Sequence, residues 1–444
     1  MDARQAACST HRLVRGLVTA ALVAGVLGAA APAAAAPAPR GYIVVLRDSV
    51  ASATATAARL ERANGFHSEH VYGHALKGFA ARLGAAQLAR VGADPDVAFV
   101  SPDRDVRIAG QVPLLPGDSS PTGVRRIGAA SATQAHQAAD VAVAVIDTGV
   151  DLTHPDLNVA SGKNCTTSRK NAAAADDNGH GTHVAGTIGA ENDGSGVVGV
   201  APGTRIYAVK VLNSSGQGTW SQVICGIDWV TQKASSLNIK VANMSLAGFG
   251  FADGLCGNLL GDALNRAICR STSAGVTYVV AAGNSGQEFS TTVPAAYPEV
   301  LTVTAMSDSD GAGGALGGAP TCRAGETDDS YASFSNFADP TDSGGQAHMV
   351  AAPGVCIQSS WLGGGYRVAS GTSMATPHAA GAVALCFGSG GAPGPCAGRA
   401  PAGVIERIRS DAAAAAPALG GFLGDPTTPV PGRYFGPLVS AAAY

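Results

Sequence analysis

The sequence predicts an α/β protein in which a mainly parallel sheet carries helices on both faces, preceded by a small α+β domain of ferredoxin-like type. One observation is that several runs, such as "VAVAVIDTG" and "TYVVAAGNSG", are almost wholly apolar and end in turn residues. Continuous apolar runs are typical of parallel strands that are buried on both faces. A second is that helical segments, such as "WSQVICGIDWVTQKA" and "TSMATPHAAGAVALC", alternate with these runs. A third is that residues 41–107 have a different pattern, with shorter strands and helices.

Residues 1–35 are predicted to be a secretory signal. Three arginines among the first 15 residues precede an apolar run from Leu17 to Ala31, and the alanine-rich stretch after it offers A-x-A cleavage sites. We expect the cut after Ala35, because this avoids a proline directly after the cut bond. An uncleaved anchor helix is the alternative, but the run is short for a full membrane span. The sequence therefore predicts a secreted, extracellular protein.

Residues 36–110 form the predicted α+β domain. Strands are expected at "YIVVLRD", "KGFAARL" and "VAFVSPD", and helices at "ASATATAARLERANG" and "AAQLARVGAD". The order strand–helix–strand–strand–helix–strand fits a split βαβ unit. Residues 111–123 are a linker rich in Pro, Gly and Ser, where a domain boundary or a processing site is expected. Residues 124–444 hold the larger α/β domain.

Composition excludes several classes of function. Charged residues make up 14% of the chain and the formal net charge is −3, so no strong field favours a polyanion or a membrane surface. We expect no nucleic-acid partner, no membrane partner and a monomer.

Cysteine usage agrees with export. Of nine cysteines, Cys8 leaves with the signal, and the remaining even number contains no C-x-x-C pair of zinc-ribbon type. In an exported chain this predicts up to four disulfides. Their connectivity stays open, although Cys256–Cys269 and Cys386–Cys396 close short loops and are favoured.

Two polar positions follow strand and turn signals in the first half of the α/β domain. Asp147 comes directly after "VAVAVI", at the end of a strand, where function collects in parallel sheets. In "DDNGHGTHVAGTIG", His180 lies at the start of a helix and His183 almost one turn later. The pair suits a metal, but no H-E-x-x-H glutamate follows. Taken alone, Asp147 also fits an ordinary turn and His183 a packed core histidine.

Two further polar positions complete a chemical set. Ser373 lies where a loop turns into a helix in "ASGTSMATPHAAG", and Asn284 ends a strand in "VVAAGNSG". Each alone fits a helix cap or a turn. Together with Asp147 and His180 they supply an acid, a base, a nucleophile and an amide donor. His180 would take the proton of Ser373, Asp147 would orient His180, and Asn284 with the Ser373 backbone N–H would stabilise an oxyanion.

The motifs resemble, in order, those of the subtilisin-like serine proteases, the subtilases. They are "VIDTGVDLTHPDL", "HGTHVAGTIG", "NMSLAG", "VVAAGNSG" and "GTSMATPHAAG", within residues 124–416. The resemblance implies a serine endopeptidase with the triad Asp147, His180 and Ser373, with Asn284 as oxyanion donor and His183 in a structural role. It also implies broad specificity for apolar or medium side chains.

The block over residues 41–107 resembles the inhibitory propeptide of the same family, in "ALKGFAARL" and "DPDVAFVSPD". The resemblance implies a self-processing zymogen whose propeptide stays bound as an intramolecular inhibitor. His67, His70 and His74 fall within eight residues, and imidazole is the side chain type whose charge can change near neutrality. This grouping predicts pH-dependent release of the propeptide, with ordinary surface or helix-end histidines as the alternative.

Protein and peptide substrates are expected to pair with two strands of the enzyme, as the resemblance implies. The family usually has Gly where Ala247 stands, so the extra methyl is expected to narrow the entrance of the main specificity pocket. The predicted substrate-binding residues are Gly216, Gln217, Gly218, Ser245, Leu246, Ala247, Gly248, Ala281, Ala282 and Gly283.

No cofactor is expected for the chemistry, but the resemblance implies a structural calcium ion. The loop "AENDGSGVVGVAP" matches a calcium loop of the family in length, and Asp156 and Asp193 would supply carboxylate oxygens. A glycine-rich turn with solvated acids is the alternative. Two other functions stay open from the residues alone: a zinc hydrolase that uses His180 and His183, and a binding domain that keeps the fold without activity.

Overall fold

The protein is described from a computed structural model that covers residues 39–108, 121–131, 135–193 and 195–444. The predicted signal and most of the predicted linker lie outside these residues. Within the described part of the chain, no helix is long and apolar enough to cross a membrane.

The N-terminal domain has the order of strands and helices that the sequence predicts, and its second strand, β2 (Ser68–Tyr72), is the one for which no segment was named. Its four-stranded sheet has the order β2-β3-β1-β4, and its core includes Val44, Leu60 and Phe79, all buried. Helix α1 begins where the Ser52 side chain accepts from the Ala55 N–H, and it ends at Gly65, whose φ of 67° suits glycine. The elements are β1 (Arg40–Leu46), α1 (Ala53–Asn64), β2 (Ser68–Tyr72), β3 (Gly78–Leu83), α2 (Ala85–Gly92) and β4 (Val97–Pro102).

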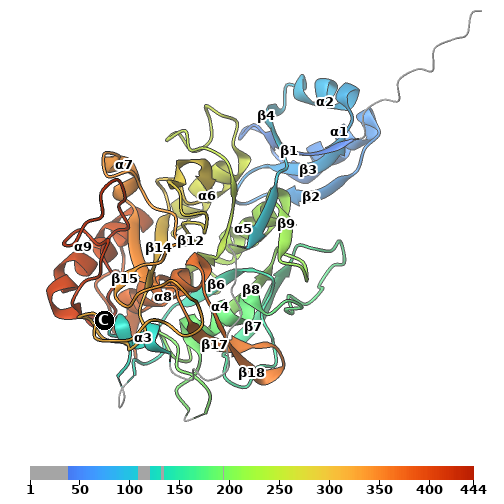
Figure 1. The fold of residues 1–444 in the computed structure, drawn as a ribbon. Coiled ribbons are helices and arrows are strands. Elements are labelled where there is room, and N and C mark those ends of the chain that lie inside the picture. The colour runs from blue at the N-terminus through green and yellow to red at the C-terminus, as the bar shows by residue number, and fades with distance from the viewer. Residues whose placement is uncertain (1–38, 109–120, 132–134, 194) are drawn as a thin grey trace, which may run out of the picture. The chain divides into compact units, whose positions relative to one another are not determined.

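The larger domain is built on an eight-stranded sheet, in which the path β14-β12-β10-β6-β8-β7 is parallel (Figure 1). Strand β16 also pairs with β14 in parallel, and only the short β15 is antiparallel among these described strands. The strands are β6 (Ala142–Asp147), β7 (Val159–Asn164), β8 (Ile206–Lys210), β10 (Ile239–Met244), β12 (Thr277–Ala281), β14 (Leu301–Ser307), β15 (Ser330–Tyr331) and β16 (Met349–Pro353).

Both faces of this sheet are covered by helices, as the continuous apolar runs predict. In β6, Val143 and Val145 belong to the core that contains α4 and α8, whereas Ala144 and Ile146 belong to the core that contains α5 and α6. The predicted α/β class is therefore confirmed. The helices are α3 (Thr122–Arg126), α4 (His180–Gly189), α5 (Trp220–Lys233), α6 (Ala263–Ser273), α7 (Ser343–Gln346), α8 (Thr372–Phe387) and α9 (Pro401–Leu419).

A second, small sheet joins the two domains. Strand β5 (Asp105–Ile108) follows the N-terminal domain and runs down beside β9 (Figure 1). It pairs on one edge with β9 (Gln217–Thr219) and on the other with β11 (Leu246–Phe249), both antiparallel. The remaining elements are β13 (Thr292–Val293), which pairs with β11, the hairpin β17 (Ile357–Trp361) and β18 (Gly365–Ala369), the hairpin β19 (Gly388–Ser389) and β20 (Ala392–Pro393), and the 3₁₀ turns Phe289–Thr291 and Leu362–Gly364.

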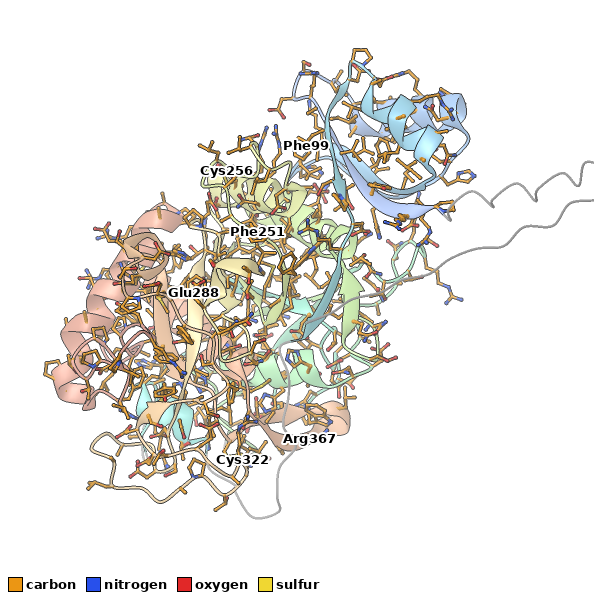
Figure 2. The ribbon with its side chains drawn as sticks, turned by 45° about the horizontal axis from the view of Figure 1, so that its top comes forward. Phe99, Phe251, Cys256, Glu288, Cys322 and Arg367 are labelled. Atoms are coloured by element: carbon orange, nitrogen blue, oxygen red, sulfur yellow. A yellow bond between two sulfur atoms is a disulfide. The ribbon has the colours of Figure 1, made fainter. Side chains whose placement is uncertain are left out.

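Four disulfides pair all the cysteines outside the signal. Cys256–Cys269 and Cys386–Cys396 are the short-loop pairs that the sequence favours, and the other two are Cys165–Cys225 and Cys322–Cys356. Figure 2 labels Cys256 and Cys322, which lie on different loops of the larger domain.

We expect thiol titration of the denatured, unreduced protein to find no free cysteine outside the predicted signal. Each bridge constrains the unfolded chain and should contribute about 2–4 kcal/mol to the free energy of unfolding, with more for the longer loops. The Cys165–Cys225 bridge closes 60 residues, so Cys165→Ala with Cys225→Ala should cost more than the same change at Cys386 and Cys396, which close 10. Titration that finds several thiols would contradict the pairing.

Candidate active site

Asp147 and His180 form a buried pair at the end of the central strand β6. The Nδ1 of His180 lies 2.7 Å from Oδ1 of Asp147, and neither side chain is exposed. The Thr148 backbone N–H donates to the same oxygen at 2.7 Å. Because the carboxylate accepts a hydrogen bond from Nδ1, it fixes the orientation of the ring and leaves Nε2 available for another partner. His180 Nε2 is buried without a hydrogen-bond partner among the described residues.

The start of α4 explains how His180 reaches Asp147. Asp176 accepts from the backbone N–H groups of Asn178, Gly179 and Thr182, so it organises the turn before the helix. Gly179 has a φ of 106°, and a Cβ there would overlap the ring of Trp361. Asp176 was not among the residues predicted from the sequence, although an acid shortly before a glycine and a helix is an N-terminal signal.

Ser373 is the second residue of α8 and is held against the end of β10. Its Oγ donates to the Ser245 carbonyl at 3.1 Å, and the Ser245 Oγ donates to the Ser373 carbonyl at 2.8 Å. Asn243 donates to the Ser245 Oγ at 3.0 Å. The first turn of α8 is therefore fixed relative to the sheet by a reciprocal pair of hydrogen bonds. The sequence did not predict this positioning role for Ser245 or Asn243.

Asn284 follows β12 with its side-chain amide oriented by Thr372. Its Oδ1 accepts from the Thr372 backbone N–H at 2.8 Å and from the Thr372 Oγ1 at 3.0 Å. Two donors at this oxygen assign the other end of the amide as the NH₂ group. That Nδ2 is buried and has no partner among the described residues. A buried donor without a partner is costly and is typical of groups that bind a ligand or a reacting atom.

These residues lie at the carboxyl ends of neighbouring strands in the middle of the sheet. Strands β6, β10 and β12 are neighbours, and Asp147, Ser245 and Asn284 end or follow them in turn. The arrangement can therefore offer a carboxylate, an imidazole, a hydroxyl and an amide donor to one substrate. Ser373 Oγ donates to Ser245 rather than to His180 here, so a proton transfer between them needs a rotation of the serine side chain.

His183 is directed elsewhere. Its Nε2 lies 3.0 Å from the Ile357 carbonyl and 3.1 Å from the Arg367 carbonyl, so this nitrogen is a donor and not a metal ligand. Burial, with a smaller effect of His180, lowers its pKa to about 3, which keeps the ring neutral. The geometry does not support a zinc site on His180 and His183.

The predicted substrate strands are the two that flank β5. Arg107 pairs with Gln217 and Ala247, and Ile108 with Leu246, through backbone register. Gly216 has a φ of 69° in the turn before β9. On the other side, Gly248 pairs with Val293. Ala281 is the last residue of β12, and Ala282 and Gly283 lead from it to Asn284. These segments surround the place where a bound chain would run.

Asp156 and Asp193 fit a calcium ion only in part. Asp156 is buried, and its two oxygens already accept from the backbone N–H groups of Glu191 and Val197. Tyr366 also donates to Asp156, and burial raises the pKa of the Asp156 carboxyl to about 6. Asp193 accepts from the Ser195 N–H. The two carboxylates lie on different loops, Asp156 before β7 and Asp193 after α4. The oxygens of Asp156 are already occupied by hydrogen-bond donors, so they do not form an open set of ligands.

Comparison with known proteins agrees with this arrangement. The sequence model described as the Subtilase family matches residues 138–389, and that described as Peptidase inhibitor I9 matches residues 41–109. Subtilisin NAT of Bacillus subtilis subsp. natto is 40% identical over 296 residues, and the chain spans 65% of its length, so about a third of that relative is not matched. The subtilisin of Bacillus pumilus is 41% identical over 271 residues, which cover 60% of this chain and 84% of the relative.

Solved structures show the same fold. A cold adapted subtilisin-like serine proteinase aligns with a TM-score of 0.52 and 30% identity, over 73% of this chain and 99% of that one. Fervidolysin from Fervidobacterium pennivorans, a keratinolytic enzyme related to subtilisin, aligns with a TM-score of 0.66 over 92% of this chain and 61% of that one. Its identity of 23% bears on fold alone.

Proposed function

The chain belongs to the subtilase family, and from this premise we propose that it is a secreted serine endopeptidase made as a self-processing zymogen. The observation that carries the proposal is the buried pair of His180 and Asp147, 2.7 Å apart, beside Ser373 and the unpartnered amide of Asn284. Its substrates are proteins and peptides that present an extended backbone between β9 and β11.

In the proposed mechanism, His180 Nε2 removes the proton from Ser373 Oγ as this oxygen attacks the substrate carbonyl. Asp147 stabilises the imidazolium through Nδ1. The tetrahedral oxyanion is bound by Asn284 Nδ2 and the Ser373 backbone N–H. His180 then gives the proton to the nitrogen of the leaving amine as the peptide bond breaks. In the second half, His180 Nε2 takes a proton from the water that attacks the acyl carbon, and it returns this proton to Ser373 Oγ as the ester bond breaks. The preference for apolar or medium side chains rests on the Ala247 methyl and on the absence of acids in the sequence of the pocket walls.

The N-terminal domain is proposed to be the inhibitor of this enzyme. It contacts α5 at two places: Asp103 accepts from the Ser221 N–H at the helix start, and Asp228, in the middle of the helix, accepts from the backbone N–H groups of Gly73, His74 and Ala75. A carboxylate at a helix N-terminus is favoured by the helix dipole. Strand β5 then occupies the position of a substrate, and the bond to be cut would follow Ile108 closely.

A casein zymogram tests the proposed activity directly. We expect a cleared band that a serine-directed phosphonylating reagent abolishes and that a chelator does not abolish. The opposite pattern, loss with the chelator alone, would support the zinc hydrolase. The absence of any band from the processed protein would support a binding domain.

We predict that the propeptide binds less tightly as pH falls, through His70. Burial, with help from the Lys163 charge, lowers the His70 pKa from about 6.5 to about 4. Between these values the free propeptide takes up a proton that the complex does not, so binding weakens as pH falls, at most about tenfold per pH unit. The charged side chains that line the same cavity are Glu69, Lys163, Arg169, Lys170 and Asp228.

The inhibition constant of the separate propeptide, measured from pH 7 downward, checks this expectation. His70→Gln should flatten the profile in that window. His67→Gln is the matched control, because His67 is exposed and should leave the profile unchanged. Equal profiles for wild type and His70→Gln would remove His70 as the cause.

Calcium at Asp156 and Asp193 stays a prediction. An ion bound only to the folded protein raises the melting temperature by mass action. We therefore expect the melting temperature of the mature enzyme to fall when calcium is replaced by a chelator, and the fall to vanish in Asp193→Asn. A melting temperature that is the same in both buffers would leave the hydrogen bonds of Asp156 as its only role.

A further inference from the structure

A cluster of exposed apolar side chains lies at the end of β11 and on the loop between β11 and α6. This apolar platform consists of five side chains with large exposed fractions: Phe249 (61%), Phe251 (48%), Leu255 (58%), Leu259 (72%) and Leu260 (57%). Phe249 and Phe251 also contact each other edge to face, with ring centroids 5.1 Å apart. Most exposed large apolar residues of the described chain belong to this apolar platform. Such a concentration marks a binding surface more often than scattered residues do.

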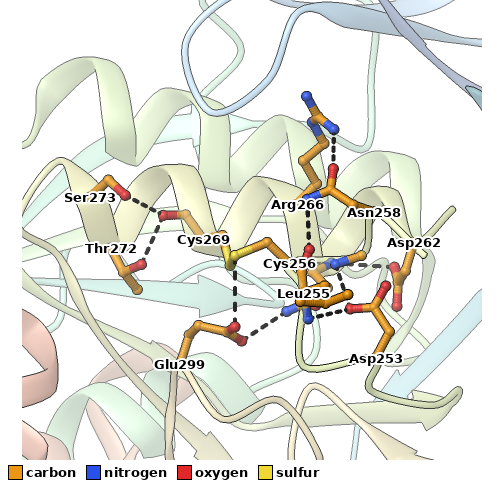
Figure 3. The surroundings of a disulfide bond; sticks show 12 residues. Asp253, Leu255, Cys256, Asn258, Asp262, Arg266, Cys269, Thr272, Ser273 and Glu299 are labelled. Carbon is orange, nitrogen blue, oxygen red and sulfur yellow. Dashed lines mark hydrogen bonds between the residues drawn. A yellow bond between two sulfur atoms is a disulfide. The ribbon is translucent and has the colours of Figure 1, made fainter. Parts of the chain in front are cut away.

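The loop is rigidly built although its apolar side chains are exposed. The Asp253 carboxylate accepts from the backbone N–H groups of Leu255, Gly257, Leu259 and Leu260. The Cys256–Cys269 disulfide ties the loop to α6, as Figure 3 shows. A surface held in one conformation loses little entropy when it binds a partner.

The apolar platform continues the cleft in which β5 lies. The Arg104 side chain, just before β5, donates to the Phe249 carbonyl at 3.3 Å. A cavity of about 190 Å³ lies between the two domains here; its lining includes Ser101, Pro102 and Arg104 on one side and Phe251, Leu260 and Tyr297 on the other. Phe99 of the N-terminal domain packs close to Gly261: a Cβ placed on that glycine would lie 3.5 Å from the Phe99 ring. Figure 2 labels Phe99 near Phe251 and Cys256.

We infer that the apolar platform binds an apolar stretch of the protein substrate, upstream of the residues that pair with β9 and β11. The inference rests on the proposed function. The antiparallel register fixes the direction: Ile108 pairs with Leu246, and residues before it run toward Phe249 and the loop beyond. When the propeptide leaves, residues 101–104 no longer cover the cavity, and the upstream part of a substrate chain takes their place. The platform therefore adds a preference that the residues next to the cut bond do not set.

The test compares three fluorogenic peptides that share the same tetrapeptide before the cut bond. One ends there, one carries an upstream Leu-Leu-Phe-Leu extension, and one carries a Ser-Gln-Ser-Gln extension. For the mature wild-type enzyme we expect kcat/KM to be about tenfold higher with the apolar extension than with the polar one, mainly through KM. In Leu259→Ser with Leu260→Ser, the ratio should fall to about one, with the short peptide cut as in the wild type.

Leu316→Ser is the matched control, because Leu316 is 84% exposed on a different loop and should keep the full ratio. Equal kcat/KM for the two extensions in the wild type would overturn the inference, while cleavage of the short peptide would keep the proposed function intact. Failure to cut any of the three peptides would instead count against the proposed function. Sedimentation of the double variant as a smaller species than the wild type would assign the platform to a second copy of the chain and overturn the substrate role.

Discussion

Ser373→Ala is expected to accumulate as one chain that still carries residues 41–107, whereas the wild type separates into two pieces. The alanine removes the only hydroxyl that the proposed mechanism uses as nucleophile, and loss of this group from a triad costs about 10⁶ in kcat. The uncut chain is already threaded, since β5 pairs with both β9 and β11. A tethered substrate has an effective concentration far above that of any free peptide, so the wild type should cut itself quickly.

Mass spectrometry of both proteins, expressed in a host without other secreted proteases, measures the outcome. The first piece of the wild type should end shortly after Ile108. Ser236→Ala is the matched control and should leave processing unchanged, because Ser236 is an exposed serine in the turn between α5 and β10. If the Ser373→Ala chain is cut at the same bond as the wild type, self-processing is wrong.

Asn284→Ala is expected to lower kcat by about 10²–10³ with little change in KM. This is the size of the loss found when subtilisin loses its oxyanion-hole asparagine, and it applies because the amide acts on the transition state. In the structure the Asn284 Nδ2 is buried and unpartnered, as a donor reserved for a reacting oxygen would be.

Thr372→Val separates orientation from donation. This variant removes one of the two donors to Asn284 Oδ1 but keeps the backbone N–H, so the amide should still point into the site. The Thr372 Oγ1 also accepts from the Gly283 N–H at 3.2 Å, so the variant loses two hydrogen bonds of about 1 kcal/mol each. We therefore expect a loss of kcat of about thirtyfold or less. An unchanged kcat in Asn284→Ala, with a melting temperature equal to that of the wild type, would remove Asn284 from the proposed oxyanion hole.

Much of the fold could be predicted because its signals are local. The strand ending at Asp147 is apolar on both faces, and the α4 segment carries an acid, glycines and a helical run in the expected order. These patterns predicted the parallel sheet, the helices and the candidate residues at the sheet edge. The short loops between Cys256 and Cys269 and between Cys386 and Cys396 predicted two disulfides for the same reason.

Other features depend on contacts between distant segments and have no local signal. Strand β5 is only four residues long, and both of its partners belong to the other domain. Gly179 leaves room for the ring of Trp361, which comes far later in the chain. The Thr372 hydroxyl orients Asn284 across 88 positions. Such pairings follow from tertiary packing, which a single sequence does not reveal.

The way in which the loop after β11 is fastened has a consequence for the lifetime of the enzyme. A protease that binds its substrate as an extended strand can cleave any loop that adopts this conformation, including loops on other copies of itself. Residues 253–262 cannot be drawn out, because Asp253 holds their N–H groups inward and Cys256 is bonded to α6. The leucine side chains that this loop exposes are of the apolar kind that we expect the enzyme to prefer. The backbone that carries them is nevertheless protected from cleavage, because it cannot adopt the extended conformation. Self-digestion should therefore start elsewhere, and reduction of the Cys256–Cys269 bond should open this loop to it.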